Sequence, residues 1–272
     1  MNQQQIDELR KKFKPYITDK KIPYALFQIK LSDCTITAYE SMKVVYQGEE
    51  LDLYVPQNKA SYPQAGSDEV GCGDYFGPVV VCACILHEKD IELLNQFNIK
   101  DSKQLTDKMI LDTVPKILDS ISHSLLILDT VKYNQIHKTN NLNQIKAKLH
   151  NQAYVHLKKK VGSLPSLSVV DQFAPEKNYY QYLSGEKEII RGLTFETKAE
   201  SKYLAVAVAS MIARYAFLKA WEKMEEYYEC SIPKGAGSSV DAFAQEFVNQ
   251  HGLQELERIA KMHFKNTDKL NI

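Results

Sequence analysis

The chain has 272 residues, 44% of them apolar and 25% charged, which suits one large globular domain or two unequal ones. Its formal net charge is zero, so the composition gives no global argument for a polyanionic partner. Five cysteines without a C-x-x-C pair argue against a disulfide framework or a zinc ribbon. The first residues lack the apolar stretch of a secretory signal, and the longest apolar run, residues 78–86, is too short to cross a bilayer. We expect a reduced, cytoplasmic protein without a membrane partner.

Positive charge is unevenly distributed along this neutral chain. Residues 1–30 hold seven Lys or Arg against three Asp or Glu, and residues 141–160 hold five lysines, two histidines and no acid. Local basic patches can neutralise phosphates even on a neutral protein. A solvated, lysine-rich helix face is the plainer explanation of each patch taken alone.

The N-terminal part has the pattern of a small α+β domain. Residues 5–14 are predicted to form a short amphipathic helix. Three segments rich in β-branched and aromatic residues then fit half-buried strands: residues 24–31, 34–40 and 42–48. A polar stretch with two prolines and a glycine is interpreted as a linker near residues 55–67. We therefore expect a small domain over residues 1–60 and a larger one over residues 61–272.

The larger domain alternates between strand and helix patterns. Strands are predicted at residues 79–86, 125–131, 167–173 and 189–195. Helices are predicted at residues 105–121, 140–160, 200–221, 240–250 and 253–263. In the first of these helices Thr106 is the expected cap and Pro115 the expected kink or break. This alternation predicts an α/β fold, with a sheet covered by helices.

Two adjacent carboxylates, Asp68 and Glu69, open the glycine-rich stretch GSDEVGCGDYFGP. Neighbouring side chains of a strand point to opposite faces, so both approach one site only at a strand end or a bulge. A buried carboxylate without a partner is costly, and a divalent cation offsets that cost. The alternative interpretation is a surface turn, in which Asp and Glu beside glycine are common.

Two further acids stand where α/β folds place ligand sites. Asp171 ends the apolar run LSVVD, and ligands bind at such strand ends, although a strand-ending turn residue explains it equally well. Glu200 opens the long apolar helix at residues 200–221 and leans toward its buried stripe. The alternative for Glu200 is a capping box, because Thr197 and Glu200 match the T-x-x-E pattern.

Together these four acids predict a metal site. If Asp68, Glu69, Asp171 and Glu200 converge on one rim of the sheet, the cluster is electrostatically unstable without cations. Two divalent ions, Mg2+ or Mn2+, about 4 Å apart would stabilise it and clamp the attacking and leaving oxygens of a phosphodiester displacement. No H-E-x-x-H, G-x-x-x-x-G-K-[ST] or G-x-S-x-G motif occurs, so zincin, P-loop and esterase chemistry lack support.

The motifs resemble those of the type 2 ribonucleases H, and most closely those of the ribonuclease HIII branch. The resemblance rests on SDEVGCGDYFGPVVV (67–81), KDSKQL (100–105), VVDQF (169–173), TKAESKYLAVAVASMIARY (197–215), PKGAG (233–237) and HFKNT (263–267). It implies a ribonuclease H-like mixed sheet flanked by helices. It also implies that residues 1–60 form a TATA-binding-protein-like domain that helps to bind the substrate.

The activity implied by the resemblance is that of an endonuclease cutting the RNA strand of RNA/DNA hybrids. It would use a two-metal mechanism and leave 5′-phosphate ends. Asp68, Glu69, Asp171 and Glu200 match the family's catalytic, metal-binding acids. The related ribonuclease HII pattern has Asp at the fourth position, so Glu200 favours the HIII branch. We expect the protein to be a monomer.

The resemblance also implies residues that contact the hybrid, mainly through the backbone of the glycine turn. The expected substrate-binding residues are Gly71, Cys72, Gly73, Tyr75, Ser102 and Lys103. For the last two, which would lie near a phosphate, the alternative is a helix cap followed by an exposed lysine. Cys72 departs from the family pattern, which has a small hydroxyl residue here in HIII and arginine in HII. A thiol at this turn predicts sensitivity to oxidation or alkylation.

Three rival functions remain open from the sequence. The first is ribonuclease HII-type cleavage at single ribonucleotides in DNA, against which Glu200 and the GCGDYFG turn argue. The second is a non-catalytic hybrid-binding protein, which the presence of all four acids disfavours. The third is a DNA-cutting nuclease or transposase of the same fold, which the ribose-facing glycine turn disfavours.

Overall fold

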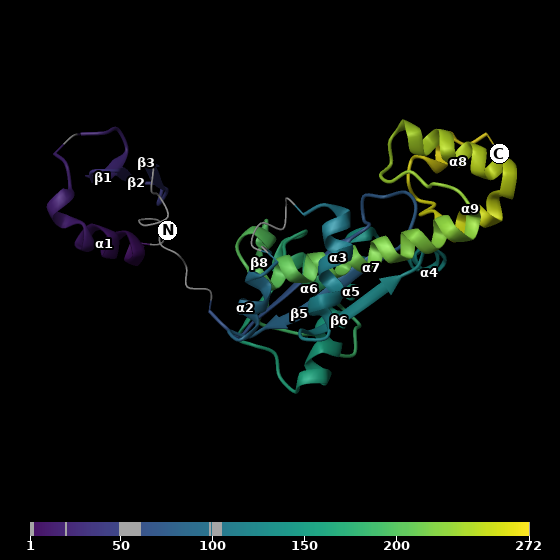
Figure 1. Cartoon of the computed structure of the whole chain (residues 1–272), viewed down its shortest axis with the longest axis horizontal. Coiled ribbons are helices and arrows are strands. Elements are labelled where there is room, and N and C mark those ends of the chain that lie inside the picture. Colours follow the sequence, from purple (N-terminus) through teal and green to yellow (C-terminus); the bar gives the residue numbers. More distant parts are fainter. Residues whose placement is uncertain (1–2, 20, 49–60, 98, 100–104, 272) are drawn as a thin grey trace. The chain divides into compact units, whose positions relative to one another are not determined.

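The protein is described from a computed structural model that covers residues 3–19, 21–48, 61–97, 99 and 105–271. The chain divides into two compact units, Met1–Ala60 and Ser61–Ile272, and each is described by itself (Figure 1). This division gives each unit its own hydrophobic core.

The N-terminal unit packs one helix against a three-stranded antiparallel sheet. Helix α1 (Gln3–Lys12) precedes strands β1 (Ala25–Lys30), β2 (Cys34–Tyr39) and β3 (Val44–Gly48), which pair in the order β1-β2-β3. The helix buries Ile6 and Leu9 against Phe27, Ile29 and Ile36 of the sheet. The helix and three strands expected from the sequence are all present, with ends that differ by a few residues.

A five-stranded mixed sheet forms the centre of the larger unit. Its strand order is β6-β5-β4-β7-β8, with β4, β5 and β6 antiparallel and β4, β7 and β8 parallel. The strands are β4 (Gln64–Val70), β5 (Val79–Leu86), β6 (Ser122–Leu128), β7 (Leu167–Asp171) and β8 (Thr194–Glu196). Strands β4 and β7 are almost 100 residues apart in the sequence, and their parallel pairing brings two of the predicted acids together.

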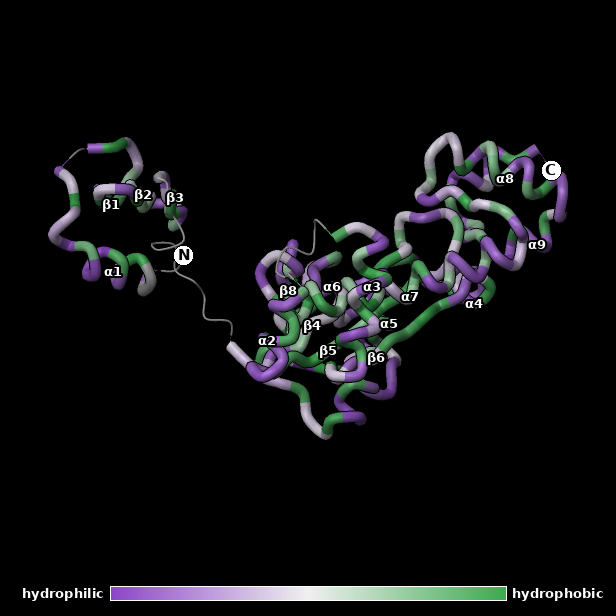
Figure 2. Tube along the Cα trace, viewed as in Figure 1, coloured by the Kyte–Doolittle hydropathy of each residue, from purple (hydrophilic) through white to green (hydrophobic). Residues whose placement is uncertain are grey.

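Helices cover both faces of this sheet, and β5 shows why. All eight residues of β5 are buried, and the strand is hydrophobic throughout (Figure 2). Val80, Cys82 and Cys84 pack on one face with α3 (Asp107–Leu118) and α7 (Leu204–Tyr228). Val81 and Ala83 pack on the other face with α5 (Leu142–Val161) and α6 (Glu176–Tyr182). The continuous apolar run of β5 is therefore typical of a strand buried on two sides.

Helix α7 is the long central helix of this unit (Figure 1). Among the described helices it alone is long and apolar enough to cross a membrane, but 67% of its most apolar stretch is buried inside the fold. The remaining helices are α2 (Asp90–Asn95), α4 (Thr130–His137), α8 (Ser238–His251) and α9 (Leu253–Ile259). The length of α7 reflects a core position, since the helix packs on β4 and β5.

The structure corrects several boundaries expected from the sequence. The linker near residues 55–67 overlaps β4, which already begins at Gln64. Residues 189–195 were predicted to be a strand, but only Thr194–Glu196 forms one. Pro115 lies inside α3 without ending it, and Thr106 caps that helix as expected, accepting a hydrogen bond from the amide of Met109.

Candidate active site

Asp68 and Asp171 end up at neighbouring positions on two parallel strands. The β4–β7 pairing runs from Gln64 opposite Leu167 to Ser67 opposite Val170. The next residue on each strand is one of the two acids. Asp171 ends β7, and Asp68 lies two residues before the end of β4, so both carboxylates are near the carboxyl ends of adjacent parallel strands, which is where α/β sheets bind ligands.

Asp68 and Glu69 point to opposite faces of β4, as strand geometry requires. Asp68 lies on the α7 side, where it hydrogen-bonds Ser210. Glu69 lies on the α5 side, where its Oε2 accepts a hydrogen bond of 2.8 Å from His150 Nε2. The two acids are usable at one site because they occupy the end of the strand, where both faces are close to the rim.

Glu69 is held between two residues of α5. Its Oε1 forms an ion pair with Lys146, and its Oε2 is bonded to His150. The other ring nitrogen of His150 is 2.8 Å from Ser67 Oγ, which fixes the imidazole. Burial alone would raise the pKa of Glu69, but the hydrogen bond and charge of His150, with Lys146, hold it at about 2. Glu69 is therefore ionised, and its orientation is set by α5.

Asp68 is in the opposite electrostatic situation. Burial, together with the negative charges of Glu69 and Asp171, raises the pKa of Asp68 to about 7. Hydrogen bonds from Ser210 and the amide of Glu69 offset only part of this effect. The charges that act on the buried Asp68 carboxylate are thus negative ones. A cation at this position would stabilise its ionised form.

Asp171 connects the sheet to the segment that carries Glu200. Its Oδ1 accepts a hydrogen bond of 2.8 Å from the amide of Ala199. Burial and the charges of Glu200 and Glu69 raise the pKa of Asp171. Glu200 is therefore within electrostatic range of Asp171, and Asp171 is in turn coupled to Asp68. The four predicted acids therefore influence one another's charge state: Glu69 and Asp171 act on Asp68, and Glu69 and Glu200 act on Asp171.

Glu200 reaches this rim by a route that the sequence did not predict. It lies on a 3-10 turn, η4 (Ala199–Ser201), ahead of α7, which begins only at Leu204 after Tyr203. Lys198 has a left-handed backbone with φ of 55°, which separates η4 from β8. The capping-box alternative is wrong for the described helix, because the residue that caps α7 is Tyr203 and it makes no side-chain cap.

The donor chemistry of these acids fits a divalent cation. Carboxylate oxygens are the hard ligands that Mg2+ and Mn2+ prefer. In the part of the chain that the structure describes, no three His, Cys, Asp or Glu side chains already stand in a metal-holding group. Glu69 contributes to the absence of such a group, because its two carboxylate oxygens bind Lys146 and His150. Asp68, Asp171 and Glu200 would carry the larger share of the negative charge facing an ion.

The glycine turn after β4 contains one structural glycine and one open glycine. Gly71 has φ of +93°, and a Cβ there would lie 2.2 Å from the carbonyl oxygen of Pro78. Gly73 is different, since a Cβ added to it would meet no atom within 4 Å. The fold needs a glycine at position 71 but not at position 73. The open approach to Gly73 is consistent with a ligand backbone that must come close.

Two predicted substrate-binding side chains serve the fold instead. Tyr75 is fully buried, and its hydroxyl is 3.0 Å from Thr267 Oγ1, so its ring packs inside the fold, and a contact through its backbone stays a prediction. Cys72 packs among apolar residues such as Tyr133. Burial and the charge of Glu69 raise the pKa of the Cys72 thiol to about 12, which argues against the predicted alkylation sensitivity, because the thiolate is the reactive form. Ser102 and Lys103 lie outside the described residues.

The sequence analysis missed the lysine beneath the glycine turn. Lys261 is fully buried, and its Nζ donates to the carbonyl oxygens of Phe76, at 3.0 Å, and Gly77, at 2.6 Å. Burial lowers the pKa of Lys261 to about 8. It fixes the end of the turn from a position 184 residues away, and its local sequence carries no signal for this role. Lys146 and His150 had a recognisable sequence signal, because their i, i+4 spacing puts them on one face of α5.

Comparison with known proteins decides the family. The family model described as Ribonuclease HII matches residues 65–267, and one described as Domain of unknown function (DUF3378) matches residues 1–67. Ribonuclease HIII of Listeria monocytogenes serovar 1/2a is 38% identical over 99% of this chain and 96% of its own. The chain belongs to the ribonuclease HIII family. Ribonuclease HIII of Bacillus pumilus is also 38% identical, over 97% of this chain and 94% of its own.

Solved structures of the family agree with the fold. The structure of Bst-RNase HIII in complex with Mn2+ matches with a TM-score of 0.77 at 35% identity, covering 98% of this chain and 95% of that one. Aquifex aeolicus RNase H3 matches with a TM-score of 0.60 at 24% identity, over 96% and 97% of the two chains, which shows the shared fold. The expected ribonuclease H-like fold and the HIII resemblance are confirmed. In one ribonuclease HIII, therefore, a divalent cation of the expected kind is bound.

Proposed function

We propose that this protein is an endonuclease that hydrolyses the RNA strand of RNA/DNA hybrids and leaves 5′-phosphate ends. The observation that carries the proposal is the pairing of β4 and β7, which sets Asp68 and Asp171 side by side next to the glycine turn. The electrostatic coupling of Asp171 to both Glu69 and Glu200 completes the acidic rim. The relatives named ribonuclease HIII match nearly the whole chain, which supports the same activity here.

The four acids would hold two divalent ions, Mg2+ or Mn2+. Such ions would supply positive charge at the scissile phosphate and lower the pKa of a bound water. Within the protein, Lys146 and His150 keep Glu69 ionised and oriented. The amide of Ala199 orients Asp171. No histidine is assigned as a general base in this proposal, since His150 is fully buried and already bonded on both ring nitrogens.

Selection for RNA is assigned to the backbone of the glycine turn. Lys261 and Tyr75 hold this turn from beneath, and the open approach at Gly73 leaves its amides accessible. Backbone amides donate hydrogen bonds to ribose 2′-hydroxyl groups, which DNA lacks. A turn fixed before binding loses little conformational entropy when the hybrid arrives.

The N-terminal unit is proposed to bind the same substrate. It exposes two aromatic side chains, Tyr16 and Tyr24, which are 53% and 79% exposed. Exposed aromatic rings and basic side chains are both typical of nucleic-acid surfaces, and α1 of the same unit ends in Arg10, Lys11 and Lys12. We also propose that the protein acts in the cytoplasm as a monomer, since one chain supplies all four acids.

The test is cleavage of an end-labelled RNA/DNA hybrid with Mg2+, Mn2+ or EDTA, by the wild type and by Asp68→Asn. We expect metal-dependent cutting of the RNA strand alone, with a rate about 10³-fold lower in the variant. Duplex DNA, duplex RNA and a DNA duplex with one ribonucleotide complete the panel. Cutting at the single ribonucleotide would indicate ribonuclease HII-type activity. Tight hybrid binding without cutting under any metal would refute the proposed hydrolysis.

A further inference from the structure

Lys146 is a buried cation at the acidic rim. Only 9% of the residue is exposed, and a lysine is almost never buried unless its charge is paired. Its partner is Glu69, whose Oε1 forms the ion pair with Lys146 Nζ. With the Lys146 side chain 11% exposed and that of Glu69 13% exposed, salt and water screen this pair only weakly. A positive charge therefore already lies at one of the acids that are proposed to hold metal ions.

The ring of Phe173 provides the second contact of this ammonium group. Lys146 Nζ lies over the ring, 4.1 Å from its centroid, where an ammonium is attracted to the negative face of the π-system. Phe173 follows Asp171 by two residues and also lies against His150, with ring centroids 5.4 Å apart. The ammonium is therefore confined between Glu69 and the chain that follows Asp171, at the rim itself.

The two carboxylate oxygens of Glu69 have partners of different mobility. Oε2 is bonded to His150, which is fully buried and is fixed through its other ring nitrogen by Ser67. Oε1 is bonded to Lys146, whose flexible four-carbon stem lets the ammonium move without moving the backbone. Release of Lys146 therefore disturbs the fold less than release of His150, and Oε1 is the oxygen that Glu69 can offer to an ion.

We propose that Lys146 is a built-in competitor of the divalent ion: its ammonium binds Glu69 Oε1 in the metal-free protein, and the ion displaces it. This inference rests on the proposed function, which assigns a metal ion to Glu69. Like charges repel, so an ion at this oxygen drives the ammonium away. Lys146 thereby neutralises Glu69 before an ion binds and lowers the affinity of the protein for that ion.

Binding of Mn2+ alone, without nucleic acid, tests the competition. It is measured from the electron paramagnetic resonance signal of free Mn2+, which disappears as the ion binds. Lys146→Met keeps an unbranched apolar side chain against Phe173 but removes the charge. We expect this variant to bind Mn2+ about tenfold more tightly than the wild type, because the ion then has no ammonium to displace. Lys146→Arg, which retains the charge, should bind Mn2+ no more tightly than the wild type.

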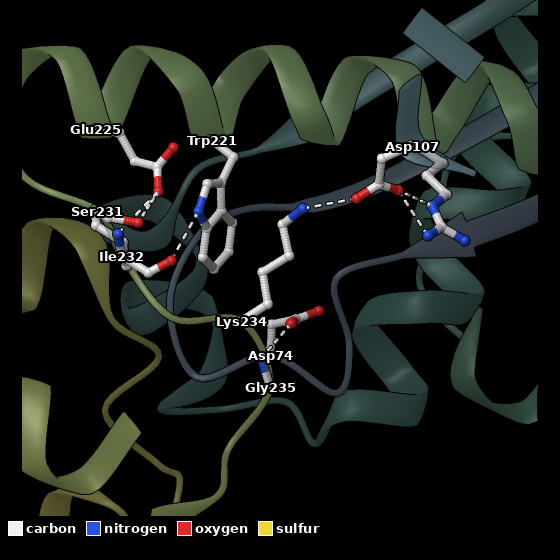
Figure 3. Close-up of polar contacts among 9 residues, drawn as sticks. Asp74, Asp107, Trp221, Glu225, Ser231, Ile232, Lys234 and Gly235 are labelled. Atoms are coloured by element: carbon white, nitrogen blue, oxygen red, sulfur yellow. Dashed lines mark hydrogen bonds and ion pairs between the residues drawn. The ribbon is translucent and has the colours of Figure 1, made fainter. Parts of the chain in front are cut away.

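Matched controls separate direct competition from a change in net charge. Lys148 lies on the same helix and forms an ion pair with Glu186 at 3.3 Å. Lys234 forms an ion pair with Asp107 at 2.9 Å, on the loop that is bonded to the glycine turn (Figure 3). Lys148→Met and Lys234→Met each remove one charge and should change the Mn2+ affinity less than about twofold. If Lys146→Met gains no more affinity than these two variants, the competition is refuted.

The ammonium can also be followed in the wild type, so the test does not depend on a variant that folds. In 1H–15N spectra of lysine ammonium groups, the shielded Lys146 group is expected to exchange slowly and to be shifted by the ring current of Phe173. Saturation with diamagnetic Mg2+ should move or remove this signal. An Mg2+-saturated protein that keeps the signal unchanged would overturn the inference. A wild type that binds Mn2+ but never cuts the hybrid would instead refute the proposed function and leave the metal-binding series to decide this inference.

Discussion

Burial of Asp68 lowers the stability of the fold at neutral pH, at the position proposed to bind a metal ion. The carboxyl group is buried beside two other acids, and its pKa in the folded protein is about 7, against about 4 for an ordinary Asp. Between these two values the folded protein binds a proton that the unfolded chain has lost. The free energy of unfolding therefore falls as the pH rises from about 4 to about 7. The fold therefore loses stability by burying this carboxylate.

We predict that Asp68→Asn stabilises the metal-free protein above pH 7. The amide cannot ionise, so at pH 8 in EDTA the variant should exceed the wild type by a few kcal/mol, about 4 at most, because one pKa unit corresponds to about 1.4 kcal/mol. At pH 4 the two proteins should differ little. Urea titrations at both pH values measure the difference, and Mn2+ should narrow it at pH 8 by stabilising the wild type. An equal gap at both pH values would contradict the assigned pKa.

The sequence pattern indicated the candidate metal-binding acids better than the residues that support them. The pattern placed Asp68, Glu69, Asp171 and Glu200 at strand ends and a helix start, although Glu200 lies on η4 ahead of α7 in the structure. Their partners are not local. His150 meets Glu69 across 81 residues, and Lys261 meets Gly77 across 184. The i, i+4 spacing of Lys146 and His150 marks a shared helix face, but only the fold shows which acid that face meets, and Lys261 has no local signal at all. The burial of Tyr75 likewise has no local signal, because its hydroxyl meets Thr267, 192 residues along the chain.

At the scale of elements, the site depends on how closely α7 approaches β4. Gly66 lies under the first turn of α7, where a Cβ would be 2.3 Å from the amide nitrogen of Val206 and 2.4 Å from the carbonyl carbon of Ala205. The obstacle is backbone, which cannot rotate away as a side chain can. This contact sets the distance between Asp68 on β4 and Ser210 on α7.

We predict that Gly66→Ala destabilises the protein by about 3 kcal/mol or more and abolishes most cleavage, because α7 must move off the sheet. Gly73→Ala is the matched control, since its Cβ meets nothing within 4 Å. It should keep wild-type stability in urea titrations but bind the hybrid more weakly. If Gly66→Ala unfolds at the wild-type urea concentration, the close approach does not limit the fold.

Elements with a strong pattern were predicted, and short or polar ones were not. The buried run of β5 and the amphipathic α3 are clear from hydrophobic spacing alone. Helix α4 was read as the end of a strand because β6 runs directly into it. The signal that separates them is Asp129, whose side chain caps α4 by accepting from the amide of Lys132. Residues 189–195 looked like a strand because isoleucine favours strands, but only their last two residues pair with β7.

At the scale of the whole molecule, the alternation of strands and helices predicted the α/β class, and a composition change predicted two domains. The strand order could not be predicted from the sequence pattern. Strands β4 and β7 pair with each other, although β5, β6 and α5 all lie between them in the sequence. The same pairing creates the site. Sequence reasoning therefore named the candidate acids without knowing the geometry that relates them.

We predict that the N-terminal unit contributes to substrate binding and that residues 61–272 carry out catalysis. Residues 61–272 contain all four acids and their own hydrophobic cores, so this fragment is expected to fold and to cut hybrids in the presence of Mn2+. Its kcat should stay within about twofold of the wild type while KM rises about tenfold, because the fragment loses binding contacts that are equal in ground and transition states. Steady-state kinetics on one labelled hybrid measure both constants.

Tyr24 offers a smaller version of the same experiment in the intact chain. Its ring is 79% exposed and its backbone is left-handed, with φ of 60°, so Tyr24→Asn removes the ring while keeping a residue that tolerates this conformation. If the ring stacks on the hybrid, KM should rise by about threefold to tenfold with kcat unchanged. An unchanged KM in both the fragment and the Tyr24 variant would remove the N-terminal unit from substrate binding. A fall in kcat of the fragment would show instead that the N-terminal unit contributes to the catalytic step. Binding and catalysis would then not be separated between the two units.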